Sequence, residues 1–181
     1  MLKFTRDFFV FVCASSAFLS CTQAVAASVT VPDAGFELAA AQSPWRFYQH
    51  AGVKAYKVLR DKEFVSEGKQ SLRITRIEEQ FFGAMSQFIT DLSPGKYRLI
   101  AKLKTSETIG KGWSLFVRIP SVAGSGSVFS GARVIGTTDW SDSAVEFVVP
   151  AGASGVEIGL SLESAGTGWA DDVRIEQLSA P

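Results

Sequence analysis

From Ser28 onward, apolar and polar residues alternate with a period of two. This pattern is typical of β-strands that turn one face into a core and the other toward solvent. The alternation predicts strands, and no convincing helix, through the rest of the chain. The clearest runs cover residues 97–104, 115–119, 145–149 and 156–163, and a shorter run begins at Leu72.

Short segments rich in glycine and proline separate these runs, and such residues supply the backbone angles that reverse a chain. About ten antiparallel strands at this spacing predict an all-β fold, either a sandwich or a barrel. No internal repeat or low-complexity linker interrupts residues 27–181, which we interpret as one domain. The predicted turns are Ser93–Gly95, Ile109–Gly112, Gly124–Gly126, Pro150–Gly152 and Ala165–Gly168.

Residues 1–26 differ from the rest of the chain. Two basic residues precede an apolar run from Phe8 to Leu19, and small residues follow it. The run is too short for a membrane-spanning helix, which needs about 20 residues. The pattern predicts a cleaved signal peptide, and hence a secreted or periplasmic protein. Because Phe18–Cys21 resembles a bacterial lipobox, the alternative is a lipoprotein anchored through Cys21.

The composition excludes one class of partner. The chain of 181 residues carries 18 basic and 18 acidic residues. Removing Lys3, Arg6 and Asp7 with the leader leaves 16 basic and 17 acidic residues. Nucleic-acid binding needs clustered positive charge, so this neutral domain is not expected to bind it. Both cysteines also leave with the leader, which excludes a disulfide or a thiolate nucleophile in the domain.

Few catalytic arrangements fit the remaining residues. His50 is the single histidine, and no serine lies in a Gly-x-Ser-x-Gly elbow, so neither a Ser-His-Asp triad nor a histidine metal site is expected. A glycosidase needs only two carboxylates about 5–10 Å apart, so a small glycoside-active enzyme stays open as an alternative. The candidate carboxylates are Glu78, Glu79, Glu146, Glu157, Glu163, Asp171 and Asp172.

Aromatic residues suggest sugar binding instead. The segment Trp45–His50 gathers three aromatic side chains with an arginine, an amide and an imidazole. Aromatic faces stack on sugar rings while polar side chains bind hydroxyl groups. Trp113 follows two glycines, and we expect it to be exposed in a turn, although each tryptophan has an alternative place in the core. The candidate sugar-binding residues are Trp45, Tyr48, His50, Arg73, Gln87, Trp113 and Arg118.

Acidic residues lie near both ends of the domain. Asp33 and Glu37 stand close to its start, and Asp172 stands close to its finish. If the first and last strands are neighbours, Glu37 and Asp172 converge. Two carboxylates with backbone carbonyls match Ca²⁺, which takes six to eight oxygen ligands. The sequence therefore indicates a structural calcium ion.

Several motifs together resemble carbohydrate-binding modules of families 4, 9 and 22. They are Gly35–Glu37, Gln70–Leu72, Met85–Ile89, Leu92–Leu99, Thr138–Trp140 and Gly168–Val173. The resemblance spans nearly all of residues 30–178. It implies a β-jelly roll of the galactose-binding-like group. It also implies a calcium held by the side chains of Glu37 and Asp172, with Asp33 and the backbone carbonyl near Gln70 as further ligands.

These observations lead to an expected function and a rival. We expect an exported, non-catalytic module that binds a polysaccharide or oligosaccharide by aromatic stacking and hydrogen bonds. The rival is an envelope, matrix or protein-interaction β-sandwich that binds no sugar and has a protein partner instead.

Overall fold

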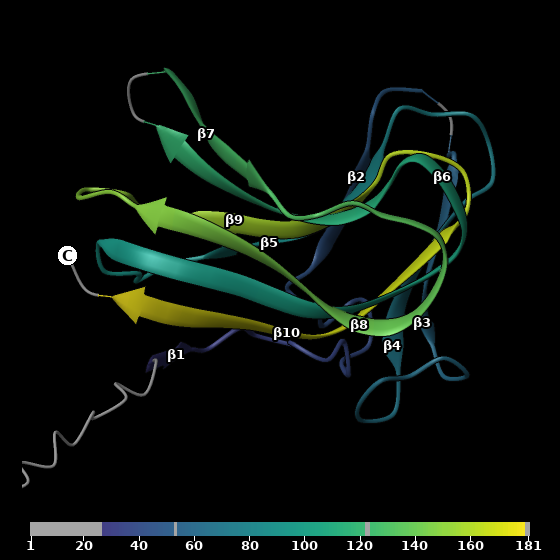
Figure 1. Ribbon diagram of the computed structural model, residues 1–181, viewed down its shortest axis with the longest axis horizontal. Coiled ribbons are helices and arrows are strands. Elements are labelled where there is room, and N and C mark those ends of the chain that lie inside the picture. The colour runs from purple at the N-terminus through teal and green to yellow at the C-terminus, as the bar shows by residue number, and fades with distance from the viewer. Residues whose placement is uncertain (1–26, 53, 122–123, 180–181) are drawn as a thin grey trace, which may run out of the picture.

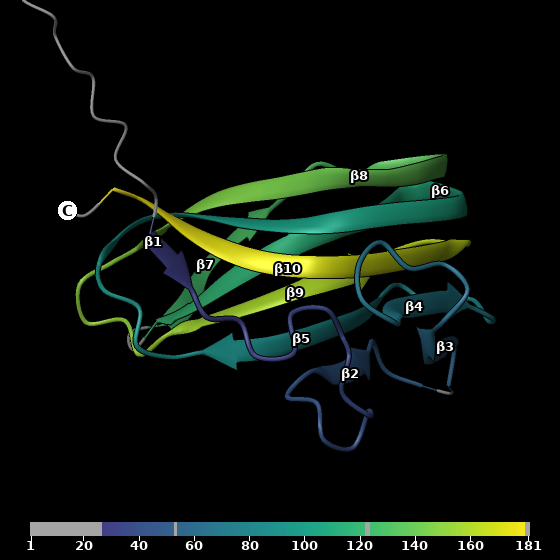
Figure 2. The same ribbon diagram turned by 90° about the horizontal axis from the view of Figure 1, so that it is seen from below.

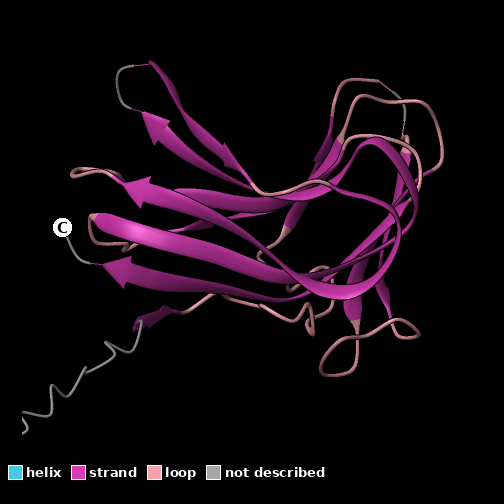
Figure 3. Cartoon of the chain, viewed as in Figure 1, coloured by secondary structure: helices cyan, strands magenta, loops and turns pink. Residues whose placement is uncertain are grey.

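The computed structural model describes residues 27–52, 54–121 and 124–179. The predicted leader and Cys21 lie outside these residues. Within the described ranges the chain consists of strands and loops without a helix (Figure 3). Correspondingly, the described residues offer no long apolar helix that would cross a bilayer.

The described residues form ten strands, and every pairing between these strands is antiparallel. The all-β architecture expected from the alternation is confirmed. The strands are β1 (Ala27–Val29), β2 (Arg46–Gln49), β3 (Tyr56–Asp61), β4 (Ser71–Arg76), β5 (Gly83–Ile89), β6 (Gly95–Ser121), β7 (Gly124–Ser130), β8 (Val134–Val149), β9 (Val156–Leu162) and β10 (Thr167–Ser179).

The strands form two layers that share β6 (Figures 1 and 2). The first half of β6 pairs with β10 and β8, and β10 pairs onward with β4 and β1. The second half of β6 pairs with β9 and β7. One layer therefore has the order β3-β4-β10-β6-β8, with β1 also beside β10, and the other has the order β2-β5-β9-β6-β7.

The prediction of a reversing turn at Ile109–Gly112 is wrong. The strand β6 continues through this segment and passes from one layer to the other. Gly110 and Gly112 have φ angles of 61° and 63°, which glycine adopts without strain. A Cβ on Gly112 would lie 2.4 Å from the carbonyl oxygen of Val134. The glycines therefore allow a corner within a strand, where the sequence pattern indicated the end of one.

The core lies between the two layers. The apolar positions of the alternating runs are buried there, while their polar neighbours point outward. Leu99 and Leu103 from β6 meet Ile158 and Leu160 from β9 in this single cluster. Each fully buried side chain of this size contributes about 1.5–3 kcal/mol. The alternation therefore fixes which face of each strand is left for function.

Candidate functional site

A groove crosses the outer face of the layer β2-β5-β9-β6-β7. The strands β2 and β7 lie at the two edges of this layer. The groove has a volume of about 220 Å³. Its lining comes from all five strands, the loop before β5 and the residue after β9: Tyr48, Phe82, Ala84, Ser114, Phe116, Arg118, Val128, Ser130, Ser161 and Glu163.

A larger hollow of about 680 Å³ continues the groove toward the end of the sandwich. The two share Phe82 and Glu163. The hollow is bounded by the β4–β5 loop and by the corner of β6, and its other lining residues are Arg76, Glu79, Gln80, Phe81, Gly110, Lys111 and Ser164. Together they give an open channel suited to a ligand longer than one small ring.

Aromatic and apolar side chains form part of the groove floor. The Phe116 ring lies over Gly159 of the neighbouring strand, where a Cβ would approach within 2.4 Å of the ring. The absent side chain at Gly159 therefore lets the ring lie close to the sheet. Tyr48 packs edge-on against Phe82, with ring centroids 6.1 Å apart, and Val128 is well exposed at the opposite side. These surfaces can contact the apolar face of a ligand.

Next to the groove, the Glu157 carboxylate contacts two of the lining residues, Tyr48 and Arg118. Glu157 Oε1 accepts a 2.7 Å hydrogen bond from the Ser86 hydroxyl, and Tyr48 Oη lies 3.5 Å from the same oxygen. The other oxygen of Glu157 lies 3.1 Å from an Arg118 nitrogen. Burial raises the pKa of the Tyr48 hydroxyl, and the Glu157 charge raises it further. The phenol therefore stays protonated and able to donate.

The charged side chains in and around the groove are paired. Arg118 pairs with Glu157, while Lys111 and Arg133 each approach Glu163 to 3.5 Å. Glu157 and Glu163 lie six positions apart along β9 and its end, which corresponds to about 20 Å of extended chain. Glycosidase carboxylates lie roughly 5–10 Å apart, so these two do not form such a pair. The arrangement suits recognition of neutral hydroxyl groups by paired donors and acceptors.

The structure brings together some of the predicted sugar-binding residues. Tyr48 and Arg118 both line the groove. His50 lies exposed just beyond it, with its ring 4.9 Å from Phe81 and 5.9 Å from Phe82. These three residues therefore belong to one face of the molecule.

Two predicted tryptophans lie in the core. The expectation that Trp113 is exposed is wrong, because its side chain is 0% exposed and its Nε1–H donates to the carbonyl of Trp169. It continues the inward positions of β6, in phase with Leu115. Trp45 is 3% exposed, packs on Phe36 and donates to a backbone carbonyl. Neither indole has an open face on which a sugar ring could stack.

Gln87 and Arg73 also lie away from the groove. Gln87 is buried and donates to the carbonyl of Pro32, so it ties β5 to the N-terminal segment. Arg73 lies on the outer face of the other layer. There its guanidinium approaches Asp61 to 3.4 Å and lies over the Trp169 ring at 5.2 Å. These two side chains therefore have structural partners elsewhere.

Sequence reasoning missed several lining residues. Phe116, Ser161 and Glu163 occupy outward positions of strands whose alternation was recognised. Their phase showed that they point away from the core. Nothing in the pattern showed that β6 and β9 are neighbours in the layer that carries the groove, because this follows from the corner in β6.

A second cluster surrounds two carboxylates near the chain ends. Asp171 is completely buried, and its Oδ2 accepts hydrogen bonds from the backbone N–H groups of Ser66 and Glu67. Glu37 Oε1 accepts from the N–H groups of Lys69 and Gln70. Burial raises the pKa of Asp171, although these N–H donors lower it, and the neighbouring Glu37 charge raises it further. One loop is thus folded around two like charges.

The four predicted calcium ligands do not form one set. The Asp33 carboxylate is buried against Ser43 and Arg60, and the Asp172 carboxylate pairs with Arg174 at 2.7 Å. The Gln70 backbone N–H donates to Glu37 Oε1, so these two of the four residues do lie side by side. Within residues 27–52, 54–121 and 124–179, no three histidine, cysteine, aspartate or glutamate side chains are grouped to hold a metal. Glu37 and Asp171 are two neighbouring hard carboxylates, a chemistry that fits a cation.

Comparisons with known proteins rest on structure. No family model matches the chain, and no curated protein matches its sequence. The CBM22-1 xylan-binding domain of Paenibacillus barcinonensis Xyn10C superposes with a TM-score of 0.62 at 16% identity, covering 81% of this chain and 93% of that one. Carbohydrate-binding modules of families 61 and 16 also match, with TM-scores of 0.56 and 0.54.

Two other similar structures have different roles. The enzymatically active domain of tailspike protein 4 from bacteriophage CBA120 gives a TM-score of 0.65 at 19% identity. That match covers 82% of this chain and only 21% of the tailspike, so the chain spans about a fifth of it. The Stig cyclase Fisc from Fischerella sp. TAU gives 0.60 at 15% identity, covering 86% of this chain and 100% of the cyclase. The chain therefore has the β-sandwich fold of carbohydrate-binding modules, which this cyclase and this tailspike domain share.

Proposed function

We propose that the protein is a non-catalytic carbohydrate-binding module of the family 4/9/22 type, and that the groove on the layer β2-β5-β9-β6-β7 binds a glycan. The observation that carries the proposal is that Tyr48 and Arg118, both held by Glu157, line the groove together with the Phe116 ring. Such a surface offers an apolar contact and several hydroxyl-binding groups together. Structural similarity to xylan-binding and galactotriose-binding modules supports this assignment.

The balanced charge supports a neutral glycan as the ligand. Arg118 and the two cations beside Glu163 already have acidic partners. An anionic chain would have to compete with those carboxylates, whereas hydroxyl groups can join the network as both donors and acceptors. The groove continues into the neighbouring hollow, which favours binding along a chain of sugar units.

The structure favours another carboxylate set for calcium, with Asp171 in place of Asp172 and without Asp33. We propose that Ca²⁺ is held by Glu37 and Asp171, with backbone carbonyls completing the oxygen ligands. The ion would offset the repulsion between the two carboxylates. Burial is the main cause of the raised pKa of Asp171, and the nearby Glu37 charge raises this pKa further. The role is structural, because the loop around these carboxylates lies apart from the residues that line the groove.

The proposed location depends on residues 1–26. We propose that they are removed as a signal peptide, leaving a secreted or periplasmic domain, with lipidation at Cys21 as the alternative. Mass spectrometry of the protein isolated from its native host tests this. An unmodified N-terminus near Ala27 supports cleavage by signal peptidase, and a lipid-bearing Cys21 supports the lipoprotein.

Affinity electrophoresis tests glycan binding directly. Xylan and β-1,4-galactan are the first probes, followed by a wider polysaccharide array. We expect slower migration in at least one gel, and loss of this effect in Arg118→Ala. Arg98→Ala is the matched control, because Arg98 also pairs with a glutamate but lies on β6 in the other layer. Unaltered migration in every polysaccharide would contradict the proposal and favour a protein-interaction role.

A further inference from the structure

A separate cavity opens at the edge of the sandwich, between β2 and β3. These are the terminal strands of the two layers, so no backbone ladder closes the space between them. The cavity has a volume of about 410 Å³, within the range of about 300–1,000 Å³ typical of small-molecule sites. Its lining residues are Ala40, Ala41, Trp45, Arg46, Phe47, Val58, Leu59, Arg60 and Met85.

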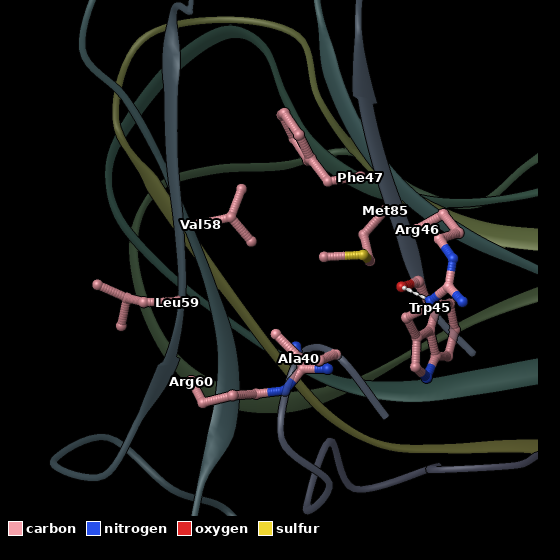
Figure 4. Close-up of a pocket in the computed structure, with 9 residues that line it drawn as sticks. Ala40, Trp45, Arg46, Phe47, Val58, Leu59, Arg60 and Met85 are labelled. Carbon is pink, nitrogen blue, oxygen red and sulfur yellow. Dashed lines mark hydrogen bonds between the residues drawn. The ribbon is translucent and has the colours of Figure 1, made fainter. Parts of the chain in front are cut away.

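The interior of this cavity is apolar. In Figure 4, Val58 from β3 faces Met85 across the space, and the Phe47 ring lies above them. The buried Trp45 indole and the methyl group of Ala40 are also among its walls. Methionine and aromatic side chains adapt to flat or extended apolar ligands. The cavity can therefore enclose the apolar body of a small molecule.

Two arginines line the cavity, one paired inside it and one exposed at its mouth. Arg60 is held inside by Ser43 Oγ at 3.0 Å and by Asp33 at 3.5 Å. Arg46 is exposed, and its guanidinium donates to the backbone carbonyls of Ser43 and Trp45. Among the described residues no carboxylate forms an ion pair with Arg46, and no acidic residue lines the cavity. An anionic group is therefore the complement of this mouth.

We propose that this cavity binds a small amphipathic carboxylate, with the apolar body between Val58, Phe47 and Met85 and the carboxylate at Arg46. Arginine binds carboxylates through short, charge-assisted hydrogen bonds. The site is independent of the glycan groove, because the two share no lining residue.

Met85 provides a local probe for the test. The chain has two methionines, Met1 and Met85, so the protein labelled with ¹³C-methyl methionine gives at most two signals. Met85→Leu, a substitution that cores tolerate well, assigns the Met85 signal. The ligands to add are 2-naphthoate and its neutral isostere 2-naphthamide.

We expect 2-naphthoate to shift the Met85 signal saturably. The affinity of 2-naphthamide should be lower by about tenfold or more, which corresponds to the 1.4 kcal/mol or more expected of a charge-assisted contact. Arg46→Gln should remove this preference, and Ala40→Trp, at an exposed wall position, should block binding of both compounds. Arg98→Gln, on the other layer, should leave both affinities unchanged.

Three results would overturn the proposal. They are an unmoved Met85 signal at saturating 2-naphthoate, equal affinities for the acid and the amide, and an undiminished preference for the acid in Arg46→Gln. Because these readouts are independent of polysaccharide binding, failure here leaves the proposed function unaffected.

Discussion

The Ser86 hydroxyl donates a 2.7 Å hydrogen bond to the Glu157 carboxylate across the neighbouring strands β5 and β9. Both side chains lie on the outer face of their layer, where Glu157 also meets Arg118. The hydroxyl therefore fixes the orientation of the carboxylate before any ligand arrives. A preorganised polar group loses less conformational entropy on binding than a mobile one.

Ser86→Ala should weaken glycan binding by about 1 kcal/mol, or roughly fivefold in Kd, because Glu157 loses its restraint. Isothermal titration calorimetry measures the change in Kd. The ligand is a polysaccharide that slows the migration of the wild-type protein in affinity electrophoresis. Ser141→Ala, at an exposed position on β8 of the other layer, serves as the control. Equal affinities for Ser86→Ala and the wild type would show that this hydrogen bond has no part in recognition.

Gly168→Ala should destabilise the domain because of the indole packed against it. A Cβ at this position would lie 2.5 Å from the Trp113 ring. Overpacking of this kind costs about 1–3 kcal/mol, and denaturant unfolding monitored by fluorescence measures it. In Gly35→Ala the nearest atoms lie at 3.6 Å, so that variant should unfold close to the wild type. If Gly168→Ala unfolds at the same denaturant concentration as the wild type, the Trp113 ring must shift without a cost in the free energy of unfolding.

Asp61 should make the stability depend on pH in the acid range. Burial raises its pKa, but hydrogen bonds from Trp169 and from two backbone N–H groups, together with Arg73, lower it below the usual value. A carboxyl group whose pKa is lower in the folded state stabilises the fold at pH values above its unfolded-state pKa of about 4. This stabilisation is lost as the pH falls through the folded-state pKa.

The Asp61→Asn variant tests this sign. Its free energy of unfolding should fall short of the wild-type value at pH 7, and the gap should narrow as the pH drops below about 4. Glu63→Gln changes an exposed carboxyl in the same loop and should show no comparable gap. A difference between Asp61→Asn and the wild type that stays constant from pH 7 to pH 3 would contradict the prediction.

Calcium should raise the melting temperature if Glu37 and Asp171 bind it. Saturating a site at about 100 times its Kd stabilises a fold by about 2.7 kcal/mol. We expect a higher Tm with CaCl₂ than with a chelator, and loss of that difference in Glu37→Gln and Asp171→Asn. Asp172→Asn should retain it, because Asp172 is paired with Arg174. An unchanged wild-type Tm would remove the metal from the proposal.

Period-two alternation predicted β4, parts of both halves of β6, the end of β8 and β9, together with the burial of their apolar faces. It did not predict that β6 runs unbroken through Gly110 and Gly112, because glycines with positive φ serve equally in a turn and in a corner. The error at Trp113 has the same origin. Continuing the alternation backward from Leu115 places the indole inside, whereas a turn would have placed it outside.

The candidate site was predictable only in part. Tyr48 and Arg118 were identified from the chemistry of their side chains, and they lie together in the groove. The sequence places Phe116 and Glu157 merely on outward faces. Which outward faces become neighbours depends on the pairing of β6 with β9 and β7, and such long-range pairings leave no local signal in the sequence.

The shared strand β6 has a mechanical consequence. Its second half carries Phe116 and Arg118 in the groove, and its first half lies beside β10, which also pairs with the N-terminal strand β1. Tension between a bound ligand and the N-terminal end of the domain would therefore pass through the β1–β10 and β10–β6 ladders and then along the covalent backbone of β6. Side-chain packing between the layers would be spared most of that load, so the sandwich should resist being pulled apart in the direction in which it holds its ligand.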